Sequence, residues 1–110
     1  MIQYVVLHTS VRNHPGVCAV QSAHATTEVL TAADVPVPGD TFVCALEAPT
    51  SGDLEALHKE LVEAGVRHVI IREPDAPYDG TATAVGFPPV ADKETLQPYV
   101  SRFRVLRKKE

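Results

Sequence analysis

The chain has 110 residues, of which 45% are hydrophobic and 22% charged, and a formal net charge of −4. These values are typical of a soluble globular domain that buries enough apolar surface to fold without disulfides or metals. No apolar stretch approaches the roughly 20 residues that span a bilayer, and no basic leader followed by a long apolar region opens the chain. We therefore expect a single domain over residues 1–110, located in the cytoplasm, that does not enter a membrane and keeps Cys18 and Cys44 reduced.

The charge is unevenly distributed along the chain. Residues 102–110 hold five of the ten basic residues and one acid, a local charge of +4, so residues 1–101 carry −8. A basic tail on an acidic body can hold a phosphate backbone only locally. A tail that merely improves solubility explains the pattern equally well.

The first third of the chain predicts a strand followed by a helix. Residues 2–7 (IQYVVL) are short, apolar and rich in β-branched side chains, which favours a buried strand. After a loop over 10–15, apolar residues recur at helical spacing over residues 16–31. On another face of this helix, Gln21, His24 and Glu28 form a polar stripe. Taken alone, such a stripe is typical of an ordinary solvent-facing helix.

The rest of the chain alternates between strands and helices. Thr50 and Asp53 predict a capping-box start for a helix that Gly65 ends. Strands are expected at 41–46, 66–71 and 81–87, a short helix at 91–97 and a short last strand at 102–106. The order of elements and the short connections predict an α/β fold, a three-layer α/β/α sandwich around a mixed four-stranded β-sheet.

Two motifs resemble one family, the archaeal and eukaryotic class of peptidyl-tRNA hydrolase. The pattern A-x-Q-x-x-H-A over residues 19–25 follows Gly16 and an apolar strand, as it does in that family. The segment GTATAVGFPP over residues 80–89 is similar to the family's G-T-x-T-x-x-x-x-G-P strand, with Pro88 in place of a glycine. The resemblance implies hydrolysis of the ester between a peptide and the 3′ end of tRNA. It also implies a homodimer that needs no organic cofactor.

The loop before the helix departs from the family pattern. The family's loop reads roughly G-x-G-K-G-K, but Pro15 and Val17 stand where its two lysines would be. The family's acidic D-A-G-x-T segment aligns with residues 73–77 in a loop about two residues shorter. Glu73 is then the acid of the candidate site.

The resemblance assigns catalytic roles to three residues. His24 would be the base that activates water, because its ordinary pKa of about 6.5 lies near working pH. Gln21, one helical turn earlier, would position the water or donate to the carbonyl oxygen. Glu73 would orient the imidazole.

Other residues are expected to bind the substrate. Arg12 and His14 lie in the loop that lacks the lysines, and Arg12 keeps a positive charge there. The remaining candidates for substrate binding are Thr81, Arg107 and Lys108. No metal is expected, since the five histidines match no ligand spacing and neither CxxC nor HExxH occurs.

Three functions fit this sequence. The first is a peptidyl-tRNA hydrolase-like protein that hydrolyses or binds the peptidyl or aminoacyl ester of tRNA. The second is a catalytically inactive member of the same fold, which acts as an RNA-binding or protein-interaction module. A third is a hydrolase or transferase acting on another small ester or amide.

Overall fold

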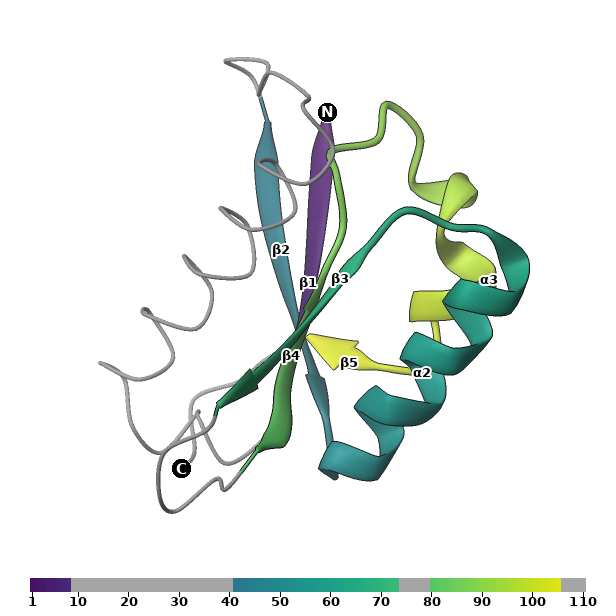
Figure 1. The fold of residues 1–110 in the computed structure, drawn as a ribbon. Helices are drawn as coiled ribbons and strands as arrows, with labels where there is room; N and C mark the ends of the chain where they lie inside the picture. Colours follow the sequence, from purple (N-terminus) through teal and green to yellow (C-terminus); the bar gives the residue numbers. More distant parts are fainter. Residues whose placement is uncertain (9–40, 74–79, 106–110) are drawn as a thin grey trace, which may run out of the picture.

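The computed structural model describes residues 1–8, 41–73 and 80–105 (Figure 1). Five strands, two helices and one 3₁₀ turn are assigned within these ranges. Their bounds are β1 Ile2–His8, β2 Phe42–Ala48, α2 Ser51–Ala64, β3 Val69–Glu73, β4 Thr81–Gly86, η2 Lys93–Thr95, α3 Gln97–Val100 and β5 Arg104–Val105.

All five strands form one mixed sheet in the order β3-β4-β1-β2-β5. β1 is parallel to β2, whereas β1–β4, β3–β4 and β2–β5 are antiparallel pairs. The expected mixed α/β architecture is confirmed, but the expected count of four strands is wrong. The additional strand is β5, which was predicted as a short last strand over 102–106 but not as a member of the sheet, and which pairs with β2 through only Val105 and Arg104. A two-residue strand is too short to produce a periodic pattern, so the sequence does not show that it joins the sheet.

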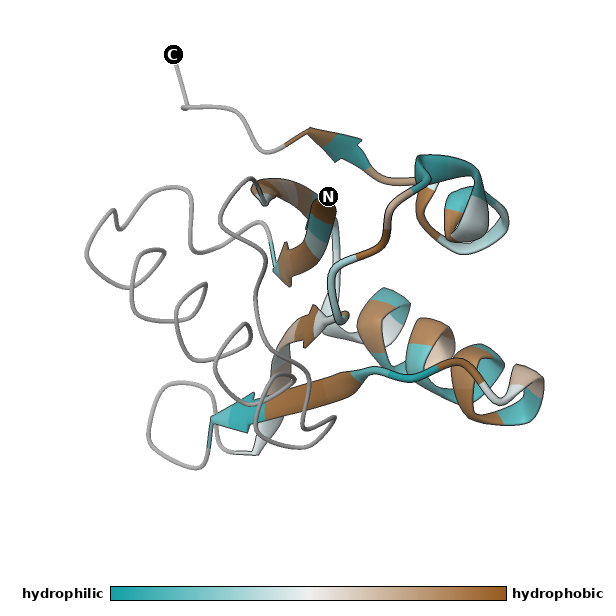
Figure 2. Cartoon of the chain, turned by 90° about the horizontal axis from the view of Figure 1, so that it is seen from above, coloured by the Kyte–Doolittle hydropathy of each residue, from teal (hydrophilic) through white to brown (hydrophobic). Residues whose placement is uncertain are grey.

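The central strand β1 is buried on both sides, as the middle layer of a sandwich requires. Tyr4 and Val6 belong to the core cluster beneath α2, whereas Val5 and Leu7 belong to a second cluster. Side chains alternate between the two faces of a strand, so these clusters lie on opposite faces of the sheet. Seen from above, α2 and α3 lie on the same side of the strands (Figure 2). The helix predicted over 16–31, which would supply the third layer, lies outside the described residues.

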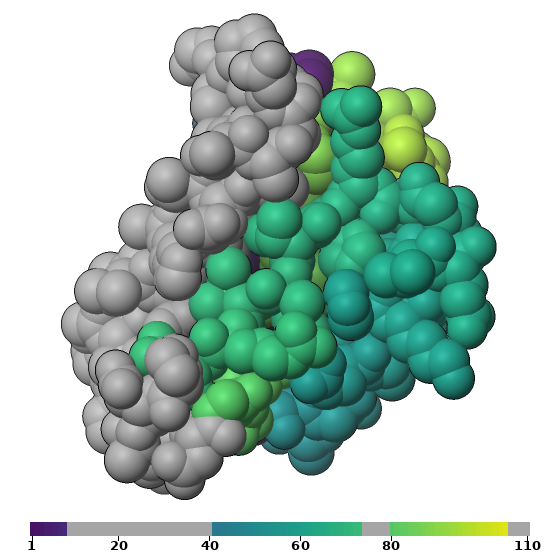
Figure 3. Space-filling model, in the orientation of Figure 1, coloured from purple at the N-terminus to yellow at the C-terminus, as the bar shows by residue number. Residues whose placement is uncertain are grey.

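The helix α2 begins and ends as the sequence predicts. Thr50 Oγ1 accepts a hydrogen bond from the Asp53 backbone N–H at 3.1 Å, and the Thr50 backbone N–H donates to Asp53 Oδ2 at 3.1 Å. Gly65 ends the helix at a φ of 70°, a left-handed conformation that favours glycine. Leu54, Leu57 and Leu61 are fully buried against the sheet. In the space-filling view, residues of α2 and β3 form a continuous surface (Figure 3).

Several bounds differ from the predicted ones, and two of these differences have a clear local cause. β3 begins at Val69 rather than at residue 66, because Val66 is still bound to the end of α2 through its N–H and the Leu61 carbonyl at 2.9 Å. The short helix predicted at 91–97 is a 3₁₀ turn capped by Asp92, followed by α3. Both differences arise at helix ends, where local capping decides the boundary.

Candidate functional site

The carboxyl ends of β1, β2 and β3 and the amino end of β4 lie at the same end of the sheet. We call this end, where the strands stop, the carboxyl edge. This follows from the pairing, because β1 is parallel to β2 and both β1 and β3 run antiparallel to β4. The chain leaves β2 at this edge and enters α2 there (Figure 1). The carboxyl ends of parallel strands are where α/β folds commonly bind ligands.

Glu73 and Thr81 lie side by side at this edge. They are cross-strand partners at the end of β3 and the start of β4, and both are partly exposed. The Gly80 backbone N–H donates to the Glu73 carbonyl at 2.7 Å, which holds the two strands together at this point. Gly80 has a φ of 83°, where a side chain is strained. The structure thus brings together two predicted site residues that came from separate motifs.

A β-bulge determines which face Thr81 occupies. Simple alternation along β4 would place Thr81 on the face of Val85, beneath α2. However, Ile71 pairs with Ala84 while Arg72 pairs with Ala82, so Thr83 is an extra residue between them. Ala82 therefore packs in the same core cluster as Val85. The bulge directs Thr81 to the opposite face, a common use of bulges near functional sites.

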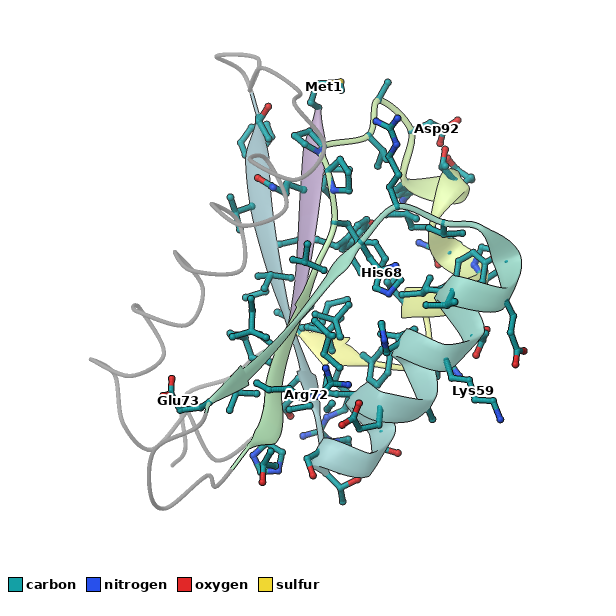
Figure 4. All side chains as sticks on the ribbon, in the orientation of Figure 1. Met1, Lys59, His68, Arg72, Glu73 and Asp92 are labelled. Atoms are coloured by element: carbon teal, nitrogen blue, oxygen red, sulfur yellow. The ribbon has the colours of Figure 1, made fainter. Side chains whose placement is uncertain are left out.

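Glu73 lies on this same face, away from α2. The preceding residue, Arg72, forms an ion pair with Glu55 of α2, with 2.6 Å between Nη2 and Oε1. Since successive side chains alternate, Glu73 faces the other way, as Figure 4 shows. The apolar side chains on this face include Leu7 and Ile71. Glu73 and Thr81 therefore form a polar margin beside a buried apolar surface.

A third polar residue on this face, Glu47, was not predicted from the sequence. It lies opposite Leu7 in the parallel register of β1 and β2, near the carboxyl end of β2. Its side chain is only 4% exposed, and its Oε1 accepts a hydrogen bond from Arg104 Nη2 at 3.1 Å. The sequence signal was a single acid within the apolar strand FVCALEA. A buried carboxylate is costly unless it is paired, so its presence there requires an explanation.

His8 lies at the same edge but on the other face of the sheet. It is the last residue of β1 and alternates with Tyr4 and Val6, which face α2. Burial lowers the pKa of His8, which favours the neutral imidazole. It is therefore separated by the sheet from Glu73 and Thr81.

The other predicted site residues lie outside the described residues. These are Arg12, His14, Gln21, His24, Arg107 and Lys108. Within residues 1–8, 41–73 and 80–105, no group of three or more His, Cys, Asp or Glu residues is arranged to hold a metal. Over the same ranges, no helix has the length and apolar character needed to cross a membrane.

The fold and the polar edge define a mixed α/β domain with a candidate ligand site at the carboxyl ends of its parallel strands. A family model, peptidyl-tRNA hydrolase PTH2, matches residues 1–106. The chain belongs to the peptidyl-tRNA hydrolase PTH2 family, which confirms the resemblance found in the sequence. Membership supports a peptidyl-tRNA hydrolase-like function with tRNA as the substrate class. No curated protein matches the chain.

Proposed function

We propose that the protein hydrolyses the ester that joins a peptidyl or aminoacyl group to the 3′ end of tRNA. The observation that carries this proposal is the family match over residues 1–106. The pairing of Glu73 with Thr81 at the carboxyl edge supports it, because it places an acid and a hydroxyl next to each other on one face.

The reaction requires a base and a means of stabilising the developing oxyanion. In the proposed mechanism His24 accepts a proton from water, whose oxygen attacks the ester carbonyl carbon, while Gln21 positions that water. The tetrahedral intermediate then breaks the ester C–O bond, and the ribose 3′ oxygen takes the proton back from the imidazolium. Glu73 orients the imidazole, and Thr81 donates a hydrogen bond to the substrate.

Binding the rest of the tRNA requires positive charge. Arg12 and His14 are proposed to contact phosphate in place of the absent loop lysines, and Arg107 and Lys108 to contact the backbone further along. The same family membership leads us to propose a homodimer in the cytoplasm.

Substitution of Glu73 tests the proposed site directly. In Glu73→Gln, the rate of release of labelled peptide from peptidyl-tRNA should fall by about tenfold or more, because the imidazolium loses the carboxylate that orients and stabilises it. The matched control is Glu63→Gln, the same change at an exposed position near the far end of α2. Equal release rates for both variants would remove Glu73 from the mechanism.

The absent lysines favour a second function, a catalytically inactive binding module. Pro15 and Val17 cannot supply the electrostatic stabilisation of a lysine, and removal of one such donor typically costs about 10²–10³ in rate. Retained tRNA binding with no peptide release at high protein concentration would favour the binding module over the hydrolase.

A further inference from the structure

Arg104 lies on the outer strand β5. A buried carboxylate holds it there, while most of its own side chain is exposed to solvent. It lies directly opposite Glu47 in the pairing of β5 with β2. The Arg104 side chain is 73% exposed, whereas that of Glu47 is 4% exposed. A guanidinium has five N–H donors, and the contact with Glu47 uses one from Nη2. The remaining donors belong to a side chain that is largely exposed.

The neighbouring Arg102 has a different environment. Its Nη2 pairs with Glu60 of α2 at 2.8 Å, its Nε donates to the Tyr99 carbonyl at 3.0 Å, and its guanidinium lies over the Phe103 ring. Both members of its ion pair are exposed, at 46% and 42%, and such surface pairs contribute little to stability. The guanidinium of Arg102 is therefore occupied by contacts within the protein surface. Arg104 instead has one contact with a buried carboxylate, that of Glu47, and is otherwise largely exposed.

The position of Arg104 relates it to the candidate site. Glu47 shares its face of the sheet with Thr81 and Glu73, and Arg104 extends from this face at the same edge. Neighbouring strands are about 4.8 Å apart, so Arg104 lies roughly 15 Å from Thr81, three strands away. This separation is too large for contact with the reacting ester. It suits a phosphate elsewhere on the same RNA strand.

We propose that Arg104 binds a phosphate of the RNA strand that carries the ester, and that Glu47 is the positioning residue that fixes its guanidinium. The inference rests on the proposed function, since the RNA is that of the substrate. The planar guanidinium suits two phosphate oxygens at once, which a lysine cannot match. Residues 1–101 carry a net charge of −8, which repels RNA. A fixed positive charge at the carboxyl edge therefore favours the approach of the RNA at this place.

The test measures binding of deacylated tRNA over a range of salt concentrations and peptide release from peptidyl-tRNA. Arg104→Gln should weaken binding about tenfold at low salt. The slope of log K against log salt should become shallower by about 0.7–0.9, the value for one phosphate contact. The loss in hydrolysis should appear mainly in KM, because the contact lies away from the ester. Arg104→Lys should restore the slope but only part of the affinity.

Arg102→Gln is the matched control and should leave both the affinity and the slope unchanged. Glu47→Gln removes the anchoring charge with little change of shape and should weaken binding even though Arg104 is present. The double variant of Glu47 and Arg104 should bind no more weakly than Arg104→Gln alone, since both changes remove one contact. If circular dichroism shows that Glu47→Gln does not fold, the three arginine variants decide the question.

The outcomes separate this inference from the proposed function. An unchanged salt slope in Arg104→Gln, with a wild type that releases peptide, would overturn the phosphate contact and leave the hydrolase. A wild type that binds tRNA through Arg104 but releases no peptide would overturn the hydrolase and support the contact. A wild type that does not bind tRNA would overturn both.

Discussion

His58 and His68 form a direct hydrogen bond between α2 and the segment that enters β3. His58 Nδ1 lies 2.8 Å from His68 Nε2, and His68 Nδ1 lies 2.8 Å from the Val66 carbonyl oxygen. A carbonyl only accepts, so His68 Nδ1 carries a proton, and the proton between the two rings lies on one of the two facing nitrogens. Figure 4 shows His68 between β3 and α2.

The pKa of His58 is lowered by burial first, then by His68 and Arg72, against an opposing effect of Glu55. Because the folded-state pKa lies below the ordinary value of 6.5, the unfolded chain takes up this proton more readily. The stability that neutral His58 contributes is therefore present above about pH 6.5 and is lost as the pH falls through the lowered pKa. On the side of the sheet that α2 covers, β4 contributes Ala82 and Val85 to the same core cluster as the leucines of α2.

We predict that His58→Gln reduces the loss of stability between pH 7.5 and pH 5. Urea unfolding at both pH values measures it, and the difference between the two free energies of unfolding should be smaller than in the wild type. His8 has a pKa lowered in the same direction, so part of the pH dependence should remain. An identical pH dependence in His58→Gln and the wild type would contradict the prediction.

Pairing of β3 with β4 brings Glu73 and Thr81 together, and Gly80 next to this pair has a left-handed backbone conformation. A Cβ at Gly80 would meet no atom within 4 Å, so the cost of Gly80→Ala comes from its φ of 83° alone. We expect Gly80→Ala to lower the free energy of unfolding by about 1–2 kcal/mol, measured by urea unfolding. Gly52→Ala, in the first turn of α2, is the control and should be neutral or mildly stabilising. Equal effects at both glycines would show that the backbone at Gly80 is not strained.

Some of these elements could be predicted from the sequence and others could not. α2 was predicted at both ends because its signals, the Thr50–Asp53 box and Gly65, lie within a few residues of the boundaries they set. The bulge at Thr83 could not be predicted, because it depends on how β4 pairs with β3. Glu47 was missed for a related reason, since its partner Arg104 lies 57 residues away in the chain. The predictions of Glu73 and Thr81 as site residues came from the family motifs rather than from the strand pattern.

The order of elements along the chain predicts a mixed sheet with helices, and the structure confirms it with one more strand. The sheet is buried on both faces, yet two apolar side chains at the start of β2, Phe42 and Val43, are 77% and 55% exposed. Most of β2 has no strand partner on its outer side among the described residues, because β5 covers only Leu46 and Glu47. An edge strand of this kind is a surface on which chains associate.

We predict that the protein is a homodimer in solution. Light scattering coupled to size exclusion measures its mass, which should be close to twice the 11.9 kDa of one chain. A mass of one chain that does not change with concentration would contradict the prediction. Phe42→Ser offers a second readout, because dimers that pair through this edge should dissociate more readily.

If the protein is a hydrolase, it must release peptide from peptidyl-tRNA over many turnovers and depend on His24 to do so. Labelled peptidyl-tRNA is incubated with the wild type at less than stoichiometric concentration and, in parallel, with His24→Ala. We expect several turnovers by the wild type and a rate about 10²–10⁴-fold lower in His24→Ala, the range that a general base contributes. No release by the wild type, or equal release by both proteins, would contradict the account.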